Sequence, residues 1–416
     1  MSQIKIVQEI YIKNGIAGSY SDGVFTTYDM DTVALCRNID NMGADVIYIT
    51  ELSQTDEEHD KNIDTVKEIV TAVDIPVMLG GNIKRLEDVK KYLYAGAEVA
   101  VLDMLKSSNA ALYKEASDRF GIEKIATLDG ELITVNQPKD TPSVIKIGCG
   151  VDESSMDIVK EFINNDINTV YGISFDSTKL MSGTENCQII DYIFVKTILK
   201  NDGIAVKEYL SKADFVEFKT DDAGLVPVIV QDYQTNEVLM MAYMNEEAYN
   251  HTVKTGRMTY YSRSRKELWE KGLTSGHFQY LKSLEMDCDK DTLLAKVYQV
   301  GAACHTGSRT CFYTNIYKKD YKENNPHKVF EDVYNVILDR KQTPKEGSYT
   351  NYLFDKGIDK ILKKVGEEAT EIVIAAKNPN PEEIKYEISD FLYHVMVLMA
   401  EKGVSWEDIT TELSRR

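Results

Sequence analysis

The chain has 416 residues, with 48 Lys and Arg against 67 Asp and Glu and a formal net charge of −19. Its length allows two to four domains of roughly 100–200 residues each, and its acidity opposes general binding to nucleic acid or anionic membranes. No apolar run approaches the roughly 18 residues of a membrane span, and the first residues lack a signal-peptide core. Six cysteines are too few for a disulfide scaffold, so we expect a cytoplasmic protein.

Residues 1–220 alternate short apolar strands with amphipathic helices. The expected strands are residues 45–50, 76–81, 99–104 and 168–174. Gly43 and Gly96 stand at the helix C-terminal turn before two of these strands, which is typical of βα units. The segment is therefore predicted to be an α/β domain with a parallel sheet, either open or closed into a barrel.

Residues 221–317 have a different pattern from residues 1–220: strand-like alternation of apolar and polar residues is interrupted by polar stretches that contain Gly and Ser. This segment is predicted to be a small α+β domain. The polar stretch 318–328, which includes Pro326, is predicted to be a linker.

Residues 329–416 carry apolar residues at three- and four-residue spacing, which predicts helices. The helical stretches are 329–340, 359–377 and 381–403. NPNP separates the last two, and Pro381 is well placed to begin a helix. The chain is thus predicted to be multidomain and to end in an all-α bundle.

Three cysteines lie close together in the middle segment: Cys288, Cys304 and Cys311. Thiolates are the soft ligands that Zn²⁺ takes at tetrahedral sites, and three protein ligands leave a fourth position for water. We therefore expect a catalytic zinc site. The alternatives are a structural zinc and cysteines that serve only as small core residues.

Three aspartates alternate around the first of these cysteines: Asp287, Asp289 and Asp291. Their hard oxygen donors suit Mg²⁺. In a strand, the aspartates would project to one face and Cys288 to the other, so one strand would serve two metals. The alternative is a solvated acidic turn.

The run from Val228 to Phe312 resembles phosphoribosyl-AMP cyclohydrolase over the whole of that domain. The matching stretches are EVLMMAYMNEEA (237–248), TYYSRSRKELWEKG (259–272), SGHFQ (275–279) and DCDKDTLLAKVYQVGAACHTG (287–307). The resemblance implies that the three cysteines bind zinc and that the three aspartates bind magnesium. In the family the zinc site takes one cysteine from one subunit and two from the other, which implies a homodimer.

The implied reaction is hydrolytic opening of the adenine ring of phosphoribosyl-AMP between N1 and C6. Water on zinc, with its pKa lowered toward about 7, supplies a nucleophile at neutral pH. His305 is the first candidate for proton transfer and His277 the second, with substrate orientation as the alternative role of His277. Substrate phosphate or ring contacts are expected from Arg263, Arg265 and Lys271, with a solvated surface role as the alternative for each.

Four carboxylates are spaced to converge in the helical segment. Glu368 and Glu371 share a helix face, and Glu387 and Asp390 repeat the spacing on the next expected helix. If these helices pack antiparallel, the four carboxylates need a cation, which predicts a Mg²⁺ site. The alternative for either pair alone is an exposed, solvated helix face.

Residues 329–416 resemble phosphoribosyl-ATP pyrophosphohydrolase, an all-α enzyme, through SYTNYLFDKGIDKILKKVGEEATEIVIAAK (348–377) and EISDFLYHVMVLM (387–399). The resemblance implies that these carboxylates hold Mg²⁺, that Glu367 lies close to the site, and that pyrophosphate is removed from phosphoribosyl-ATP. Triphosphate contacts are expected from Lys360, Lys363 and Lys364. The product of this reaction is the substrate of the ring-opening step.

Residues 1–220 resemble a diverged relative of the histidine-pathway (βα)₈ barrel that forms imidazole glycerol phosphate. YIKNG (11–15) and IPVMLGGNIKRLEDVKKYLYAGAEVAVLD (75–103) are among the stretches that carry the likeness. Gly80 and Gly81 match a phosphate loop and Asp129 matches the second acid, but Tyr11 stands where the family has its first catalytic aspartate. One strand–helix unit is missing after the sixth. We therefore expect a degenerate, non-catalytic barrel with a structural or docking role.

Two further hypotheses compete with a two-step hydrolase. In one, only one of the two metal sites is active and the other is scaffold. In the other, the chain is a zinc-stabilised binding or scaffold protein with neither hydrolase active.

Overall fold

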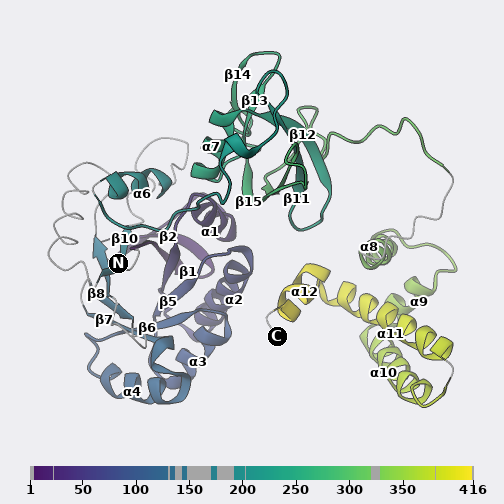
Figure 1. Cartoon of the computed structure of the whole chain (residues 1–416). Helices are drawn as coiled ribbons and strands as arrows, with labels where there is room; N and C mark the ends of the chain where they lie inside the picture. Colours follow the sequence, from purple (N-terminus) through teal and green to yellow (C-terminus); the bar gives the residue numbers. More distant parts are fainter. Residues whose placement is uncertain are drawn as a thin grey trace. The chain divides into compact units, whose positions relative to one another are not determined.

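The computed structural model describes residues 4–21, 23–129, 132–135, 143–147, 170–175, 192–201, 203–319, 328–379 and 381–414. The chain divides into two compact units, Met1–Asn315 and Ile316–Arg416 (Figure 1). The predicted boundary near residue 220 therefore falls inside the first unit. The predicted linker lies almost wholly outside the described residues, as do Cys149 and Cys187.

The first unit begins with a barrel-like sheet. Its strands are β1 (Lys5–Lys13), β4 (Val46–Glu51), β5 (Val77–Gly81), β6 (Val99–Asp103), β7 (Ile125–Asp129), β8 (Leu132–Val135), β9 (Ser143–Ile147) and β10 (Val170–Phe175). They pair in that order, and β10 pairs back onto β1 to close the ring. A hairpin of β2 (Ile16–Ser21) and β3 (Val24–Thr27) extends from β1.

Among the described strands, β8 departs from regular βα repetition. Strands β4 to β7 pair parallel, as predicted, whereas β8 is antiparallel to both β7 and β9. An antiparallel pair needs only a short turn, whereas a parallel pair needs a crossover connection. The four strands predicted from sequence are confirmed as β4, β5, β6 and β10, and the unit expected to be missing after the sixth lies largely outside the described residues.

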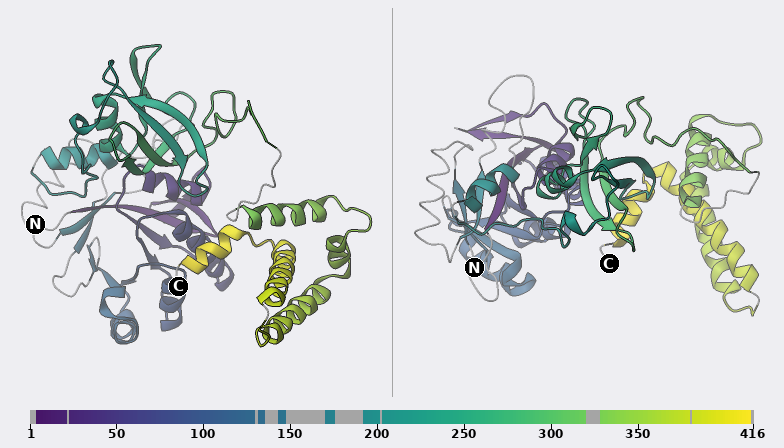
Figure 2. Two further views of the ribbon diagram at one scale, coloured as in Figure 1. Left: turned by 45° about the vertical axis from the view of Figure 1, so that its right-hand side comes forward. Right: turned by 45° about the horizontal axis from the view of Figure 1, so that its top comes forward.

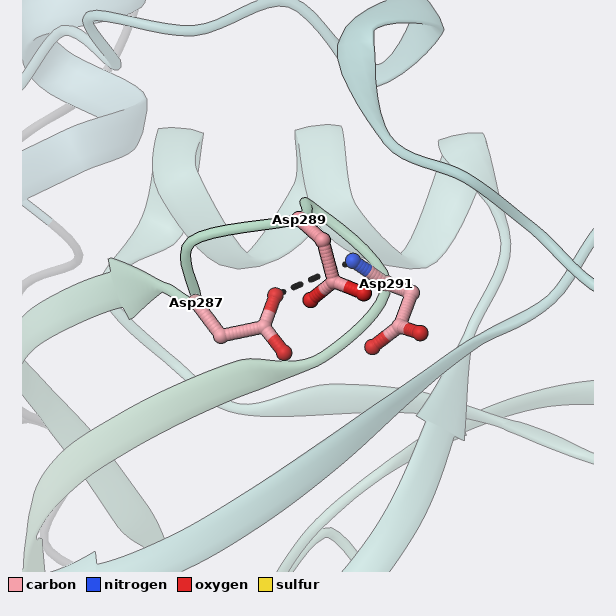
Figure 3. A group of neighbouring side chains, drawn as sticks. All are labelled: Asp287, Asp289 and Asp291. Carbon is pink, nitrogen blue, oxygen red and sulfur yellow. Dashed lines mark hydrogen bonds between the residues drawn. The ribbon is translucent and has the colours of Figure 1, made fainter.

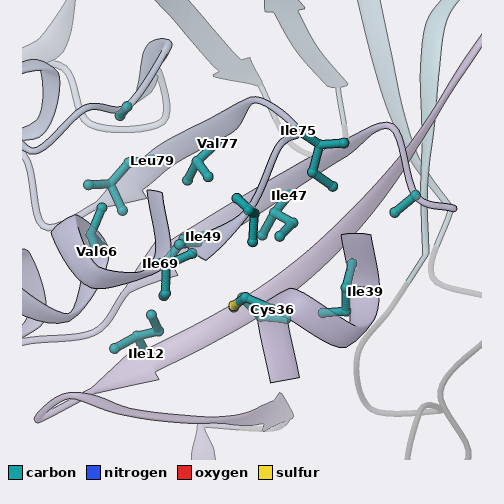
Figure 4. Packing of buried hydrophobic residues seen from close by; sticks show 14 of the residues in the cluster. Ile12, Cys36, Ile39, Ile47, Ile49, Val66, Ile69, Ile75, Val77 and Leu79 are labelled. Carbon is teal, nitrogen blue, oxygen red and sulfur yellow. The ribbon is translucent and has the colours of Figure 1, made fainter. Parts of the chain in front are cut away.

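Helices cover the outside of the described strands (Figure 1). They are α1 (Thr32–Asn41), α2 (Asp56–Ala72), α3 (Leu86–Tyr94), α4 (Asn109–Phe120) and α6 (Tyr192–Asn201). The sheet has a hydrophobic layer on each face, because successive side chains of a strand point to opposite faces. On β4, Ile47 and Ile49 pack outward with helix residues, whereas Tyr48 packs inside the ring with residues of other strands. Figure 4 shows the outer layer, where Ile69 of α2 and Cys36 of α1 lie near the β4 isoleucines.

The rest of the first unit is a small α+β fold, as expected. Its four-stranded sheet has the order β12 (Val238–Met244), β11 (Val226–Asp232), β16 (Leu293–Gln299) and β15 (Gln279–Met286). A separate hairpin joins β13 (Thr259–Ser262) to β14 (Glu267–Glu270), and α7 (Glu246–Thr255) packs beside it. The alternation of buried residues along β16 matches a sheet that covers a core on one face.

The second unit is helical, as predicted. Its helices are α8 (Val329–Gln342), α9 (Tyr349–Lys356), α10 (Ile358–Ala375), α11 (Pro381–Lys402) and α12 (Trp406–Ser414). The connection between α10 and α11 is short, so the two helices lie side by side, as both views in Figure 2 show. None of the helices in the described ranges is long and apolar enough to cross a membrane.

A buried ion pair stabilises the barrel-like sheet. Nζ of Lys196 on α6 lies 2.6 Å from Oδ1 of Asp45, and the two side chains are only 8% and 3% exposed. Asp45 also accepts a hydrogen bond from the backbone amide of Ile6 on β1, at 2.9 Å. The pair therefore ties α6 to the start of two strands.

We predict that Lys196→Met lowers the free energy of unfolding by about 3–5 kcal/mol, because it leaves the Asp45 carboxylate buried without a cation. The matched control is Lys67→Met, because the Lys67–Asp64 pair is exposed and such pairs contribute less than about 1 kcal/mol. Urea unfolding followed by circular dichroism measures both. Equal losses in the two variants would contradict the assignment.

Candidate active sites and metal centres

The three aspartates of the middle segment lie in the turn between β15 and β16, not in a strand. The expectation of one strand with two faces is therefore wrong. The physical reason is that the chain reverses here: Lys290 adopts φ of 66°, and Oδ1 of Asp287 accepts hydrogen bonds from the backbone amides of Asp291 and Thr292 at 3.0 and 3.2 Å. The reversal brings the carboxylates together, as Figure 3 shows for Asp287, Asp289 and Asp291.

The carboxylate group in this turn has the chemistry of a site for a hard cation. One oxygen from each of Asp287, Asp289 and Asp291 lies within 4.8 Å of the others, and all three residues are exposed. Desolvation opposes ionisation of Asp287, but hydrogen bonds from the amides of Thr292 and Asp291 hold its pKa below the usual value. Converging ionised carboxylates repel one another, so a bound Mg²⁺ would relieve the repulsion.

Cys304 and Cys311 lie together in the loop after β16. Cys304 is buried, and its thiol pKa is lowered mainly by the Thr306 hydroxyl, which donates to Sγ at 3.2 Å, with help from the Thr306 amide and the Cys311 thiol. Burial and the neighbouring Cys304 raise the pKa of the more exposed Cys311. The environment therefore favours a thiolate at Cys304, which is the form that binds zinc.

Cys288 does not join the other two cysteines in one chain. It is exposed in the aspartate turn. Within the described ranges, the groups of three or more ligand atoms closer than 4.8 Å are the aspartates of this turn and a set of glutamates, and neither includes a cysteine. The neighbouring thiols of Cys304 and Cys311 could supply two of the ligands of a zinc site. Within a single chain, Cys288 does not supply a third ligand.

The two predicted catalytic histidines both lie beside the loop that carries Cys304. Nδ1 of the exposed His305 is 4.0 Å from Sγ of Cys304. The ring of the half-buried His277 packs on Gly301, where a Cβ atom would lie 2.8 Å from the ring. Glycine at 301, with φ of 62°, thus permits both the turn and the close approach of the imidazole.

The predicted substrate contacts of this domain have different surroundings. Lys271 is buried and donates to the carbonyl of Ala303 at 2.7 Å, and its pKa is lowered by burial despite the nearby cysteines. It therefore supports the loop directly before Cys304. Arg263 lies over the Tyr243 ring, 3.9 Å from its centroid, and Arg265 pairs with the exposed Glu267.

Three of the four predicted carboxylates of the helical unit come together. Oxygens of Glu368, Glu371 and Glu387 lie within 4.8 Å of one another, and Asp390 is exposed outside this group. The close Glu368 carboxylate is the main reason that the pKa of Glu371 is raised. Like charges held this close fit a divalent cation with oxygen ligands.

Lysines flank the same carboxylates. Nζ of Lys364 is 2.9 Å from Glu368 and 3.1 Å from Glu367, and these carboxylates raise its pKa. Lys363 pairs with Glu367 at 3.4 Å. Lys360, on the same helix, forms no ion pair with any residue that the structure describes. The helix therefore brings cations to the edge of the carboxylate group.

Sequence reasoning missed His394 and Tyr349. His394 is buried, with Nδ1 2.8 Å from the carbonyl of Asp390 and 3.6 Å from Oε1 of Glu368. A carbonyl oxygen can only accept, so Nδ1 donates to it, and Nε2 lies 3.1 Å from the Tyr349 hydroxyl. The spacing of His394 could have indicated its place near the site, because it follows Asp390 by about one helical turn and so lies on the same helix face.

The barrel-like sheet has a cavity of about 390 Å³ at the carboxyl ends of its strands. Its lining includes Gly81 but neither Tyr11 nor Asp129. Gly81 has φ of 116°, and a Cβ atom there would lie 2.1 Å from the backbone oxygen of Glu51, so glycine permits β5 to approach β4. Tyr11 packs against Tyr20.

Three family models match the chain. Residues 240–313 match phosphoribosyl-AMP cyclohydrolase, and residues 330–416 match phosphoribosyl-ATP pyrophosphohydrolase. Residues 5–190 match a model described as a histidine biosynthesis protein. The three matches fall, one each, in the N-terminal α/β segment, the middle α+β segment and the C-terminal helical segment.

Several similar proteins carry the name histidine biosynthesis bifunctional protein HisIE. One from Thermoanaerobacter pseudethanolicus is 56% identical over 209 residues, 47% of this chain and 97% of the relative. One from Caldanaerobacter subterraneus subsp. tengcongensis is 53% identical over 203 residues, 49% and 98%. One from Bacillus subtilis is 46% identical over 209 residues, 50% and 97%. Nearly the whole of each relative is therefore matched within about half of this chain.

We predict that Thr306→Val weakens binding of zinc, the metal expected at the thiols, by about 10–100-fold, because residues that support metal ligands contribute this much to affinity. Removal of the hydroxyl takes away the hydrogen bond to Sγ of Cys304. Competition with a chromogenic chelator measures the affinity. The control is Thr370→Val, whose hydroxyl bonds only within its own helix; unchanged affinity in Thr306→Val would refute the role.

Proposed function

We propose a mechanism for this chain from the premise that it belongs to the family of bifunctional histidine-biosynthesis proteins HisIE. The chain is a phosphoribosyl-AMP cyclohydrolase and a phosphoribosyl-ATP diphosphatase. The helical unit removes pyrophosphate from phosphoribosyl-ATP, and the middle domain opens the adenine ring of the resulting phosphoribosyl-AMP between N1 and C6. The observation that carries the proposal is that ligand-type side chains converge in both matched segments.

In the ring-opening site, Cys304 and Cys311 would hold Zn²⁺ together with Cys288. Bound zinc supplies a Lewis acid that makes water a stronger nucleophile at neutral pH. His305, beside Cys304, accepts the proton that the attacking water loses, and His277 orients the substrate ring. Lys271 holds the loop of Cys304 through the Ala303 carbonyl.

The zinc site is shared between two copies of the chain. One copy places Cys304 beside Cys311, and its own Cys288 does not reach them. An exposed Cys288 is suited to enter the site of a second copy. The functional form is therefore a homodimer with two equivalent sites, as expected for an isologous pair.

The aspartate turn holds Mg²⁺ next to this site. Asp287, Asp289 and Asp291 supply the oxygen ligands, and Cys288 belongs to the same turn. Binding of Mg²⁺ would fix the turn and with it the position of Cys288. Exposed Arg263 and Arg265 would meet the substrate phosphate, because guanidinium groups bind phosphate in a bidentate manner.

In the helical unit, Glu368, Glu371 and Glu387 hold Mg²⁺, with Asp390 one turn further along α11. Bound Mg²⁺ supplies charge neutralisation for the triphosphate. Lys364, with Lys360 and Lys363 on the same helix, binds phosphate oxygens as the charge on them develops. Glu367 orients Lys364. The expected attack is by water at the α–β linkage.

The barrel-like segment is non-catalytic and docks on the ring-opening domain. Nη1 of Arg37 on α1 donates to the Tyr298 hydroxyl at 3.0 Å, and its guanidinium lies 5.3 Å from the centroid of that ring. Lys282 on β15 pairs with Asp74 at 2.6 Å. These contacts join α1 and the residues after α2 to β16 and β15, while Tyr11 stands in the place of the first acid.

Two variants separate the two reactions. Cys304→Ala is expected to lower ring opening by at least about 100-fold, because it removes a metal ligand, so that phosphoribosyl-AMP accumulates. Glu371→Gln is expected to stop the sequence one step earlier, with phosphoribosyl-ATP left intact. Chromatography of the nucleotides and the absorbance change on ring opening measure both.

Activity of mixed dimers provides the control for the shared site. Cys288→Ala and Cys304→Ala chains, each inactive alone, are expected to regain part of the ring-opening activity when mixed, because one pairing contains an intact site. Both variants must retain pyrophosphate release as evidence of folding. Ring opening at the normal rate by Cys304→Ala would disprove the zinc assignment.

The docking role predicts an effect on stability rather than on chemistry. The double variant Arg37→Ala/Lys282→Ala is expected to lower the melting temperature of the first unit and to increase proteolysis around residues 203–220. Both kcat values are expected to stay within about twofold, since surface pairs of this kind contribute roughly 1 kcal/mol or less each. Loss of either reaction without loss of stability would contradict a docking role.

A further inference from the structure

A cavity of about 570 Å³ lies at the start of α9 in the helical unit. It is formed by the turn before the helix and by the first two helical turns, with Lys345, Ser348, Tyr349, Asn351, Tyr352 and Asp355 among its lining. Its volume falls in the range of about 300–1,000 Å³ that small-molecule sites occupy. Ser348 caps α9 by accepting from the amide of Asn351, which fixes the turn.

Two partly exposed tyrosine rings line this cavity. Tyr349 and Tyr352 are 45% and 43% exposed, and their rings lie nearly parallel, with centroids 6.2 Å apart and an interplanar angle of 23°. Exposed aromatic faces in a hollow are the usual platform for a nucleobase, because every base has a π-face that stacks.

A buried histidine connects one of these rings to the carboxylate group. The Tyr349 hydroxyl bonds to Nε2 of His394, and Nδ1 of His394 lies 3.6 Å from Glu368. Two exposed tyrosines would by themselves be an ordinary helix surface. The contact with a histidine that is 5% exposed and next to a predicted metal ligand distinguishes this pair.

We infer that this cavity binds the purine base of the nucleoside triphosphate, stacked on Tyr349 and Tyr352. The inference rests on the proposed function, since its ligand is the substrate of the helical unit. The triphosphate belongs at Glu368, Glu371 and Glu387, and the ribose that separates the α-phosphate from the base carries the base to a neighbouring site. The Tyr349–His394 contact makes this cavity that neighbour.

The lining of the cavity carries one lysine, Lys345, and two carboxylates, Glu346 and Asp355. Lys345 lies at its edge, where its backbone amide donates to Oδ1 of Asn351 at 3.0 Å. Its ammonium group forms no ion pair with the described part of the chain. Of these charged groups, the Lys345 ammonium is the one that could bind a second phosphate of the ligand.

Tyr352 is the residue to change, because it forms no contact with His394 among the described residues and its loss leaves the carboxylates supported. In the full chain with Mg²⁺, Tyr352→Leu is expected to raise KM for phosphoribosyl-ATP at least about fivefold and to leave kcat within about twofold. Tyr352→Phe keeps the ring and is expected to behave as the wild type. A tenfold or greater fall in kcat with unchanged KM would overturn the inference.

A binding measurement separates the base from the triphosphate. ATP and inorganic tripolyphosphate both carry the phosphate chain, but only ATP carries a purine, so calorimetry is expected to show tighter binding of ATP to the wild type. Tyr352→Leu should remove that advantage and leave tripolyphosphate binding unchanged. Tyr352→Trp retains a stacking face, and its fluorescence should be quenched by ATP but not by tripolyphosphate.

The two possible failures are distinguishable. Equal binding of ATP and tripolyphosphate to the wild type, or an ATP advantage that survives in Tyr352→Leu, would overturn the base site even if phosphoribosyl-ATP is hydrolysed normally. Absence of hydrolysis by the wild type would instead count against the proposed function, whatever the binding data show.

Discussion

Repulsion among anionic ligand groups is the constraint on which the functional parts of this structure depend. The aspartate turn and the α10–α11 glutamates each hold three carboxylates with oxygens within 4.8 Å of one another. Such groups raise one another's pKa unless hydrogen bonds or cations offset the repulsion. The fold supplies hydrogen bonds at Asp287 and lysine and histidine partners at Glu368. The remaining charge is what a divalent cation would neutralise.

The aspartates, Cys304 and the glutamates are each positioned by a different kind of backbone structure. A hairpin turn with a left-handed residue gathers the aspartates, and a glycine-containing loop supported by Lys271 and Thr306 holds Cys304. Two helices joined by a short connection bring the glutamates together. A turn and a loop depend on few contacts, whereas paired helices bury an apolar stripe. Loss of metal is therefore expected to disturb the first two sites more than the third.

The barrel-like segment is stabilised by hydrophobic layers and by a buried ion pair. Its hydrophobic layers are intact on both sides of the strands, and α6 is tied to them by the Lys196–Asp45 pair. Tyr11 packs against Tyr20, and neither Tyr11 nor Asp129 lines the cavity at the strand ends. The Arg37–Tyr298 and Asp74–Lys282 contacts between this segment and the ring-opening domain support the docking role that we propose for it.

The amino-acid sequence by itself determined the order of the α/β, α+β and helical segments, four strands of the barrel-like sheet, the helices α8, α10 and α11, and the residue types suited to bind metals. The helices α9 and α12 were not predicted. Periodicity and residue chemistry act locally, so they are visible in one dimension. Only the tertiary structure decided that Asp287, Asp289 and Asp291 converge in a turn, that Asp390 lies outside the glutamate group, and that Cys288 stays apart from Cys304 in one chain. It also brought His394 to Glu368 and Tyr349 to His394, although these residues are distant in sequence. The aspartates converge because the chain reverses in a local turn between two paired strands. The positions of Asp390, His394 and Tyr349 depend on helix packing, which arises from contacts between residues far apart along the chain.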